Sequence, residues 1–254
     1  DPGYAYAFIW STPKLLELYE ANNDIDRCNW NIAPFTYTQS AGEGTPVDGR
    51  EFVKGKRDEV EQQYWDKSFS YGKTNPGSTY GDRESKNDAN KNRNRAAAKY
   101  RREYEADKKS KNDTSINFPL LRYSDILLMI AEAENEVNHG PNDLAYECIN
   151  AVRERAGISK LQENLDETNF REAIKDERAM ELCFEYTRRF DLIRWGDYYK
   201  LMQEQVSKAQ TDESWKFGIN VYTYFNIPKS YNYFPIPANE IGSNGAIKTN
   251  NPGW

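Results

Sequence analysis

Apolar residues recur at helical spacing in the stretch FPLLRYSDILLMIAEAENE, which occupies positions 118–136. Spacings of i, i+3, i+4 and i+7 place one set of side chains on a single helix face: Tyr123, Ile126, Leu127, Ile130, Ala133 and Val137. Leu128, Met129 and Ala131 add apolar surface on the other sides of this helix, so we expect neighbouring elements to enclose it. Pro119 stands where a first helical turn tolerates a missing N–H.

A second helix is expected after the turn sequence HGPND. Its apolar positions are again at helical spacing: Leu144, Ala145, Cys148, Ile149, Val152 and Ala156. Gly157 is suited to end it. Two antiparallel helices over 118–157 form a helical hairpin of about one tetratricopeptide unit. A single hairpin cannot bury its own face, since such repeats need about three stacked units. We therefore expect further repeats from outside this chain or from its other helices.

Helices are also predicted on either side of this hairpin. The sequence STPKLLELYE, starting at Ser11, combines an N-cap, a helix-starting proline and apolar residues, and its helix should stop at Asn22. A third long helix is expected over about 167–188, with Ile174, Met180, Cys183 and Phe184 facing inward. A short helix beyond Gly196, reaching Gln205, precedes an aromatic, proline-rich tail.

The first part of the chain is loop-rich. One helix over about 56–66 and weak strand signals at 30–37 and 97–104 interrupt it. The predicted fold is mainly α, built of tetratricopeptide-type helical hairpins with long ordered loops and little β. Residues 1–117 form the loop-rich, ligand-facing part of this prediction, and residues 118–254 form a helical scaffold and tail.

Composition argues against several classes of function. The net charge of −6 argues against nucleic acid as a partner. Three cysteines are spaced too far apart for a zinc or redox motif. No apolar run approaches the roughly 20 residues of a membrane span. The chain opens at DPGYAYAF without a signal peptide, and we expect it to be a piece of a longer protein.

The segment ERAMELCFEYTRRFDLIRW carries the most concentrated charge. Glu177, Glu181 and Glu185 are four residues apart, and basic and acidic residues surround them: Arg178, Arg188, Arg189, Asp191 and Arg194. Such carboxylates could form a glycosidase pair or a cation site. Like charges at i, i+4 require cations nearby, so we favour a structural ion-pair network. The only histidine, His139, argues against a triad or a histidine-based zinc site.

Three other polar stretches are candidates for binding ligands. The Asp/Asn-rich segments at 22–26 and 86–90 lack the glycine and the distal glutamate of a calcium loop. A weakly bound structural calcium ion is an alternative that the sequence leaves open, and no other metal or cofactor is predicted. The basic stretch 93–111 interleaves tyrosines with arginines, but acids flank it. A solvated strand and loop is the interpretation we prefer to a nucleic-acid strip.

Tryptophan and tyrosine rings in the 28–80 region are the remaining candidates for binding. The flat faces of sugar rings stack on such side chains, and nearby amides and carboxylates can bond the hydroxyl groups. We predict that any ligand site on this chain draws on Trp30, Tyr64, Trp65 or Tyr71. For each ring taken singly, ordinary packing within a loop is the alternative.

Five segments, in order, resemble the C-terminal half of the SusD/RagB family: STPKLLELYEANNDIDRCNW, FPLLRYSDILLMIAEAENE, INAVRERAG, ERAMELCFEYTRRFDLIRWG and YFPIPANEI with the closing NNPGW. The resemblance implies a non-catalytic lipoprotein on the outer face of a Bacteroidetes-type outer membrane. It also implies an N-terminal part outside this chain, which would carry the lipid anchor and most tetratricopeptide helices. No family motif assigns a ligand residue to this sequence.

The resemblance further implies two partners: a glycan ligand, and a TonB-dependent transporter of the SusC type on which the protein sits as a lid. Three alternatives remain beside glycan capture. The protein could bind peptides, as some RagB-like members do, or serve as a tetratricopeptide scaffold for another protein. A glycoside hydrolase is the less favoured alternative, since nothing beyond the glutamate stripe supports it.

Overall fold

The computed structural model describes residues 11–33, 96–97, 99–100, 115–211 and 225–254. Within these ranges the fold is mainly helical, as predicted. The chain divides into two compact units, Asp1–Tyr186 and Thr187–Trp254. The helix predicted over 56–66 lies outside the described residues.

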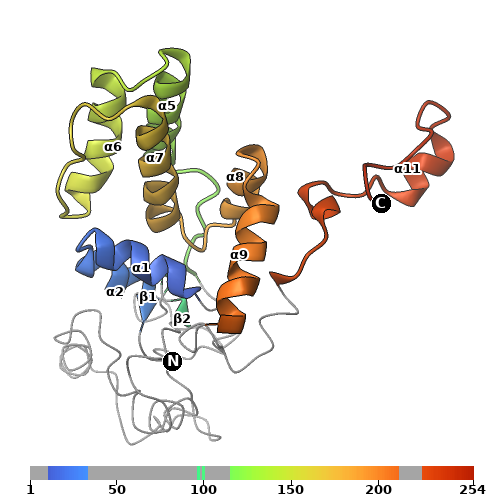
Figure 1. Cartoon of the computed structure of the whole chain (residues 1–254), viewed down its shortest axis with the longest axis horizontal. Coiled ribbons are helices and arrows are strands. Elements are labelled where there is room, and N and C mark those ends of the chain that lie inside the picture. The colour runs from blue at the N-terminus through green and yellow to red at the C-terminus, as the bar shows by residue number, and fades with distance from the viewer. Residues whose placement is uncertain (1–10, 34–95, 98, 101–114, 212–224) are drawn as a thin grey trace, which may run out of the picture. The chain divides into compact units, whose positions relative to one another are not determined.

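Three helices form the main core of the first unit: α5 (Tyr123–Val137), α6 (Asp143–Arg155) and α7 (Glu167–Glu181). The predicted hairpin is confirmed, because α5 packs along α6, and α7 packs against both (Figure 1). Apolar side chains from all three helices and from the residue after α7 are buried together: Leu128, Ala131, Ala145, Cys148, Ile149, Val152, Phe170, Ile174 and Leu182.

The predicted end of α6 is also confirmed. Gly157 adopts φ of +78°, a backbone conformation that costs glycine little. The N–H groups of Gly157 and Ile158 donate to the carbonyls of Glu154 and Arg153, at 3.0 and 3.1 Å. These two bonds form a Schellman motif, which satisfies carbonyls that the end of the helix would leave unpaired.

The prediction for α5 was wrong in two respects. The helix begins at Tyr123, so Pro119 is not in its first turn. The side that faces the core is not the predicted face either, since its buried residues are Asp125, Leu128, Ala131 and Asn135. Its two buried polar side chains bind α7: Asp125 accepts a bond from Arg178, and the Asn135 amide donates to the Glu167 carbonyl. Polar partners on α7 therefore select the inward side of α5.

The long helix predicted over 167–188 is shorter in the structure. Helix α7 ends at Glu181, and residues Phe184 and Tyr186 have φ of about +60°. Left-handed backbone at two non-glycine residues cannot continue an α-helix. This turn carries the chain out of α7 and leaves Glu185 close to the end of the helix.

The described residues of the first unit also include two short helices and a strand pair: α1 (Pro13–Ala21), α2 (Ile25–Asn31), β1 (Ile32–Ala33) and β2 (Ala96–Ala97). The predicted stop of the first helix at Asn22 is confirmed. The strand predicted over 30–37 is only partly right, because residues 30–31 belong to α2 and residues 34–37 lie outside the described residues. The pair is antiparallel, with Ile32 opposite Ala97 and Ala33 opposite Ala96. The strand predicted at 97–104 is largely wrong, because only residue 97 of that range belongs to β2. Residues 99–100 form a turn, and 101–104 lie outside the description.

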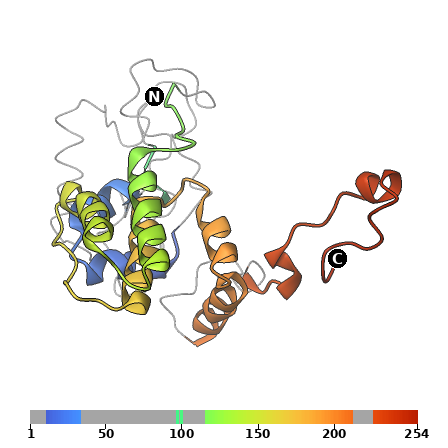
Figure 2. The ribbon, with the colours of Figure 1, turned by 90° about the horizontal axis from the view of Figure 1, so that it is seen from above.

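A second core joins the two short helices to α7. It contains buried residues from α1, α2, β1 and α7: Leu16, Leu18, Tyr19, Cys28, Ile32, Ala179 and Met180. The Tyr19 hydroxyl donates to the Met180 carbonyl at 2.7 Å and accepts a bond from Asn31. Helix α7 is thus packed on one side by the hairpin and on another by α1 and α2, as the two views of the ribbon show (Figures 1 and 2).

The described residues of the second unit include the helices α8 (Arg188–Arg194), α9 (Tyr198–Thr211) and α11 (Ala238–Ser243) and the 3-10 helix η4 (Lys229–Asn232). The helix predicted to end at Gln205 thus reaches Thr211. Contacts join α8 to α9 and α9 to η4.

The last residue, Trp254, packs against η4. The Trp254 ring stacks on Tyr231 with 5.4 Å between centroids, and its indole N–H donates to the Ser230 carbonyl at 3.1 Å. Gly253 permits this approach through φ of +87°, and a Cβ added there would lie 2.6 Å from Cβ of Ser230. The tail therefore depends on glycine at this position.

Candidate functional site

Helix α7 carries two of the three glutamates into the interior of the first unit. Glu177 and Glu181 are one turn apart on its buried side, and Glu185 follows in the turn beyond the helix. All three side chains are buried. Because an isolated buried carboxylate is very costly, each of them requires cationic partners.

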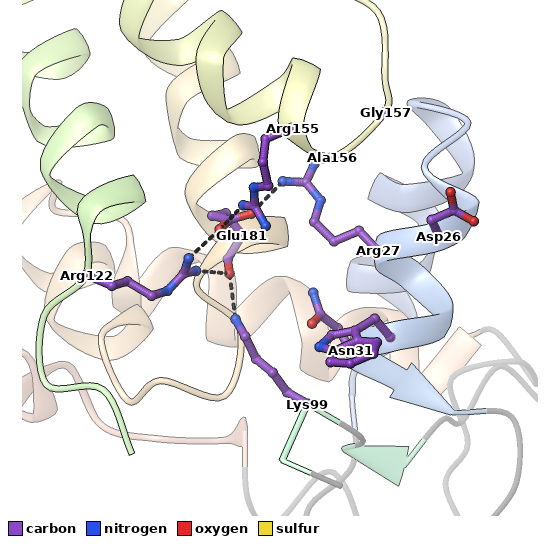
Figure 3. Close-up of a pocket in the computed structure, with 10 residues that line it drawn as sticks. Asp26, Arg27, Asn31, Lys99, Arg122, Arg155, Ala156, Gly157 and Glu181 are labelled. Atoms are coloured by element: carbon purple, nitrogen blue, oxygen red, sulfur yellow. Dashed lines mark hydrogen bonds and ion pairs between the residues drawn. The ribbon is translucent and has the colours of Figure 1, made fainter. Parts of the chain in front are cut away.

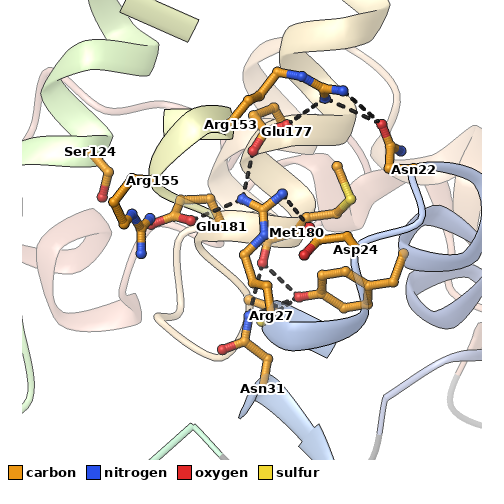
Figure 4. A network of polar contacts seen from close by, with 12 residues as sticks. Asn22, Asp24, Arg27, Asn31, Ser124, Arg153, Arg155, Glu177, Met180 and Glu181 are labelled. Carbon is orange, nitrogen blue, oxygen red and sulfur yellow. Dashed lines mark hydrogen bonds and ion pairs between the residues drawn. The ribbon is translucent and has the colours of Figure 1, made fainter. Parts of the chain in front are cut away.

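The partners of Glu177 come from two other helices. Arg27 of α2 donates to Glu177 Oε1 at 2.5 Å, and Arg153 of α6 donates to Glu177 Oε2 at 2.9 Å. Arg27 also donates from Nε to Asp24 at 2.6 Å, and Arg153 reaches the side chain of Asn22. Figure 4 shows these side chains converging between α2 and α7. The carboxylate joins three helices at one point.

Glu181 is surrounded by three guanidinium groups. Arg27, Arg122 and Arg155 all bind its carboxylate, as Figure 3 shows. Burial by itself raises the pKa of Glu181, but Arg122 and Arg155 outweigh burial and hold that pKa at about 2. Glu181 is therefore an anion across the whole physiological pH range, and it has no proton to donate.

Lys99 connects the turn after β2 to the end of α7. Its ammonium group donates to the Glu181 carbonyl at 2.6 Å and forms an ion pair with Glu185. Arg122 donates to the other oxygen of Glu185 at 2.8 Å. A cation at a helix C-terminus is stabilised by the helix dipole. The predicted solvated strand and loop is wrong for Lys99, whose side chain is largely buried; most of the basic stretch lies outside the described residues.

The predicted ion-pair network is confirmed. Arg178, one of its predicted cations, binds Asp125 at 2.8 Å. Cations that bind the stripe come from α2, the turn after β2, the segment before α5, and α6: Arg27, Lys99, Arg122, Arg153 and Arg155. The INAVRERAG segment contains two of them, but no periodicity in the sequence connects the other three to α7.

A pocket of about 430 Å³ opens over this network. Its walls come from α2, the β2 turn, the end of α6 and α7: Asp26, Arg27, Trp30, Asn31, Lys99, Arg122, Arg155, Ala156, Gly157 and Glu181. Its floor consists of side chains already held by ion pairs (Figure 3). Its rim offers more accessible groups, including the Arg155 side chain, which is 59% exposed, and the exposed Asp26. The volume falls within the usual range of small-ligand sites.

Trp30 is the one predicted binding residue that the described ranges include, and it lines this pocket. The residue is 47% exposed and lies on α2, one turn after Arg27. Tyr64, Trp65 and Tyr71 lie outside the described residues, so their place in a site stays a prediction. Sequence reasoning missed the pocket's polar groups, among them Asp26 and Arg155. The four-residue spacing from Asp26 to Trp30, which places both side chains on one side of a helix, was a signal that could have identified Asp26.

The segment 22–26, which the sequence offered as a candidate calcium loop, binds arginine side chains of the protein. Of the segment 22–26, Asn22 accepts bonds from Arg153, and Asp24 is bound by Arg27. In the parts of the chain that the structure describes, no group of three His, Cys, Asp or Glu residues is arranged to hold a metal ion. The three cysteines are buried as free thiols, and burial raises the pKa of Cys183.

The profile of the SusD family matches residues 1–254. The chain belongs to the SusD family. Two SusD-like proteins of Formosa agariphila are similar to it: P25 is 38% identical over 136 residues, and P2 is 30% identical over 149. These matches cover 52% and 56% of this chain but only 23% and 27% of the two relatives. The chain thus matches about a quarter of the length of these relatives.

Solved structures of the family have the same fold. A SusD homologue from Bacteroides thetaiotaomicron VPI-5482 is 29% identical, with a TM-score of 0.64 over 95% of this chain and 43% of its own. A SusD superfamily protein from Bacteroides vulgatus ATCC 8482 is 23% identical, with a TM-score of 0.56 over 96% of this chain and 44% of its own. Among the described residues, no helix is long and apolar enough to span a membrane.

Proposed function

We propose that this SusD family chain belongs to a non-catalytic cell-surface protein that captures an oligosaccharide or polysaccharide. The captured glycan would pass to a TonB-dependent, SusC-like transporter in the outer membrane. The protein would be held there by a lipid anchor outside these 254 residues. The observation that carries the proposal is the family match over the whole chain.

The geometry of the glutamates supports binding rather than hydrolysis. A glycosidase needs one carboxyl group that donates a proton and a second that acts as a base or nucleophile. Glu181 has a pKa of about 2, and Glu177 is fully buried between Arg27 and Arg153. Carboxylates fixed by guanidinium groups serve to hold helices together.

The ligand site that we propose on this part of the chain is the pocket beside Trp30. The partly exposed indole offers an apolar face for the C–H groups of a sugar ring, and Asp26 and Arg155 at the rim offer an acceptor and donors for its hydroxyl groups. The described charged groups in and behind the pocket balance: five cations (Arg27, Lys99, Arg122, Arg153, Arg155) face five acids (Asp24, Asp26, Glu177, Glu181, Glu185). A balanced site suits hydroxyl groups better than a strongly charged ligand.

A glycan array followed by titration calorimetry tests the two levels of this proposal separately. We expect binding to at least one class of glycan. By analogy with base–aromatic stacking, Trp30→Ala should cost roughly 1–3 kcal/mol of affinity, and Trp30→Tyr should cost less because a ring remains. Tyr233→Ala, which removes a half-exposed ring of the second unit, is the control.

The possible results are distinct. Absence of glycan binding across the array would refute capture of glycans, and binding of peptides instead would favour the peptide-binding alternative. Glycan binding that Trp30→Ala leaves unchanged would refute the pocket as the site but not the function.

A further inference from the structure

Three aromatic rings of the first unit lie in contact with one another. The ring centroid of Phe118 is 5.4 Å from that of Tyr100 and 5.4 Å from that of Tyr186. The planes of these two pairs are tilted by 44° and 50°. We call Tyr100, Phe118 and Tyr186 the aromatic cluster. Segments that are far apart in the sequence supply its three members, so no local pattern announces it.

The aromatic cluster borders the wall of the pocket that Lys99 and Arg122 form. Both cations line the pocket, and both bind the buried carboxylate of Glu185 (Figure 3). Tyr100 is the residue after Lys99, and Tyr186 is the residue after this glutamate. Burial, together with the charge of Glu185, raises the pKa of Tyr100 to about 12, which places the phenol near that carboxylate. Two rings of the cluster are therefore joined directly to the groups behind the pocket wall.

Tyr186 presents its ring to solvent from a backbone conformation that bulky residues rarely adopt. Its φ is +61°, and the residue is 72% exposed. Glycine avoids the cost of left-handed backbone, as Gly157 does at the end of α6. Burial in a core does not offset this cost at Tyr186, because most of the residue is open to solvent. Costly conformations of this kind cluster at ligand sites.

We infer that Phe118 and Tyr186 form a second sugar-binding position beside the pocket, so that the protein takes a glycan of several units. The inference rests on the function proposed above. One sugar unit would occupy the pocket beside Trp30, and another unit of the same chain would stack on the two exposed rings. Phe118 is 41% exposed, whereas Tyr100 is half-buried and supports Phe118 through their ring contact.

The chemistry of the aromatic cluster suits a saccharide. Its ring faces can accept the C–H groups of a sugar, and the Tyr186 hydroxyl can donate or accept a bond with the sugar hydroxyl groups. The neighbouring charges are paired, because Lys99 and Arg122 both bind Glu185. Stacking on a ring is tolerant of what is stacked. The cluster is therefore suited to lengthen the bound segment of a glycan rather than to select one kind of sugar.

Glycans of graded length test the inference. The probes are oligosaccharides of glucose, galactose, mannose and xylose, from disaccharides to octasaccharides, titrated by calorimetry into the full chain. We expect the affinity of the native protein to rise with the length of the probe. Tyr186→Gly, which removes the ring and relieves the left-handed backbone, should lose at least about fivefold in affinity for the longest probe that binds. It should keep its affinity for the disaccharide of the same series.

Two further variants control for the ring and for its location. Tyr186→Phe should bind the longest probe nearly as well as the native protein, because the stacking face remains. Tyr233→Ala removes a half-exposed ring of the second unit and should change the affinity at no length. Trp30→Ala should weaken binding of short and long probes alike, since it acts on the pocket itself.

Melting temperatures separate a ligand contact from a structural one. Because glycine adopts a φ of +61° readily, Tyr186→Gly should unfold close to the melting temperature of the native protein. A clear fall in that temperature, with affinity lost equally at every length, would assign the ring to the structure and overturn the inference. Tyr186→Asn is the second variant if Tyr186→Gly folds poorly by circular dichroism, since asparagine also tolerates left-handed backbone.

The inference and the function on which it rests fail in different ways. Affinities of Tyr186→Gly that match the native protein at every length, while Trp30→Ala still weakens binding, overturn the second sugar-binding position alone. Absence of binding by the native protein to every probe and to the glycan array refutes glycan capture, and the inference falls with it.

Discussion

Arg27 and Glu177 are 150 positions apart in the sequence, yet 2.5 Å separates Nη1 of the arginine from Oε1 of the glutamate. Both side chains are buried, and the same guanidinium also binds Asp24 and Glu181. A buried ion pair adds little net stability over an apolar core, but the loss of one partner leaves an uncompensated charge. The network therefore makes the junction of α2, α6 and α7 sensitive to single substitutions.

Glu177→Gln tests this sensitivity. The variant leaves Arg27 and Arg153 facing a neutral amide in the core, so we expect the free energy of unfolding to fall by about 3–5 kcal/mol. Urea unfolding followed by circular dichroism measures the loss. Glu172→Gln on the exposed side of the same helix is the control, and it should change stability by at most about 0.5 kcal/mol. Similar effects of the two substitutions would contradict the structural role of the network.

Acidic pH should lower the free energy of unfolding of the first unit, because Glu181 becomes protonated. Its pKa is about 2 in the folded protein and 4.5 as the reference value, so its contribution is complete above about pH 5 and is lost as the pH falls toward 2. The shift corresponds to about 3 kcal/mol. Asp24, whose pKa is raised by burial, acts with the opposite sign. Unfolding free energies measured between pH 6 and pH 2.5 should fall less steeply for Glu181→Gln than for the native sequence. Parallel curves would count against the assignment.

Gly253→Ala should release the C-terminal tryptophan from η4. The position has φ of +87°, and a Cβ would lie 2.6 Å from Ser230 Cβ, so alanine must shift the tail. We expect a cost of about 1–3 kcal/mol in the second unit, together with loss of the Trp254–Tyr231 stack in near-ultraviolet circular dichroism. Gly245→Ala meets no atom within 4 Å and should leave the spectrum unchanged. An unaltered spectrum for both variants would refute the close approach.

Phe170→Ala tests the core shared by α5, α6 and α7. The ring is fully buried, and its centroid lies 5.0 Å from that of Tyr146. Removing it should cost about 3–5 kcal/mol, because a cavity remains where the ring was. Leu144→Ala, at an exposed position of α6, should cost no more than about 0.5 kcal/mol. Thermal unfolding of both variants measures the difference, and equal melting temperatures would place Phe170 outside the core.

Much of this protein's helical structure could be predicted from local patterns. The apolar spacing over 144–156 and Gly157 at its end identified α6, because both signals act within a few residues. The like-charged stripe of Glu177 and Glu181 implied nearby cations, since such a helix is unstable without them. Trp30 was singled out as a candidate ring, and it lines the pocket. None of these inferences required knowledge of distant contacts.

The tertiary structure alone decided which groups meet. Helix α5 is apolar on two sides, and periodicity cannot tell which side is inward. Asp125 and Asn135 select the buried side because their polar partners lie on α7. The end of α7 at Glu181 depends on left-handed backbone at Phe184 and Tyr186. The conformational preferences of phenylalanine and tyrosine do not predict such a backbone.

The amino-acid sequence by itself determined where helices form, where several of them end and that the buried acids would need cations. It did not determine that Arg27, Lys99 and Arg122 supply much of that charge, because these residues are distant in sequence and follow no common period. Local propensity acts over a few residues, whereas an ion pair in the core depends on how whole helices pack. The pocket beside Trp30 exists only because that packing brings α2, α6, α7 and the β2 turn together.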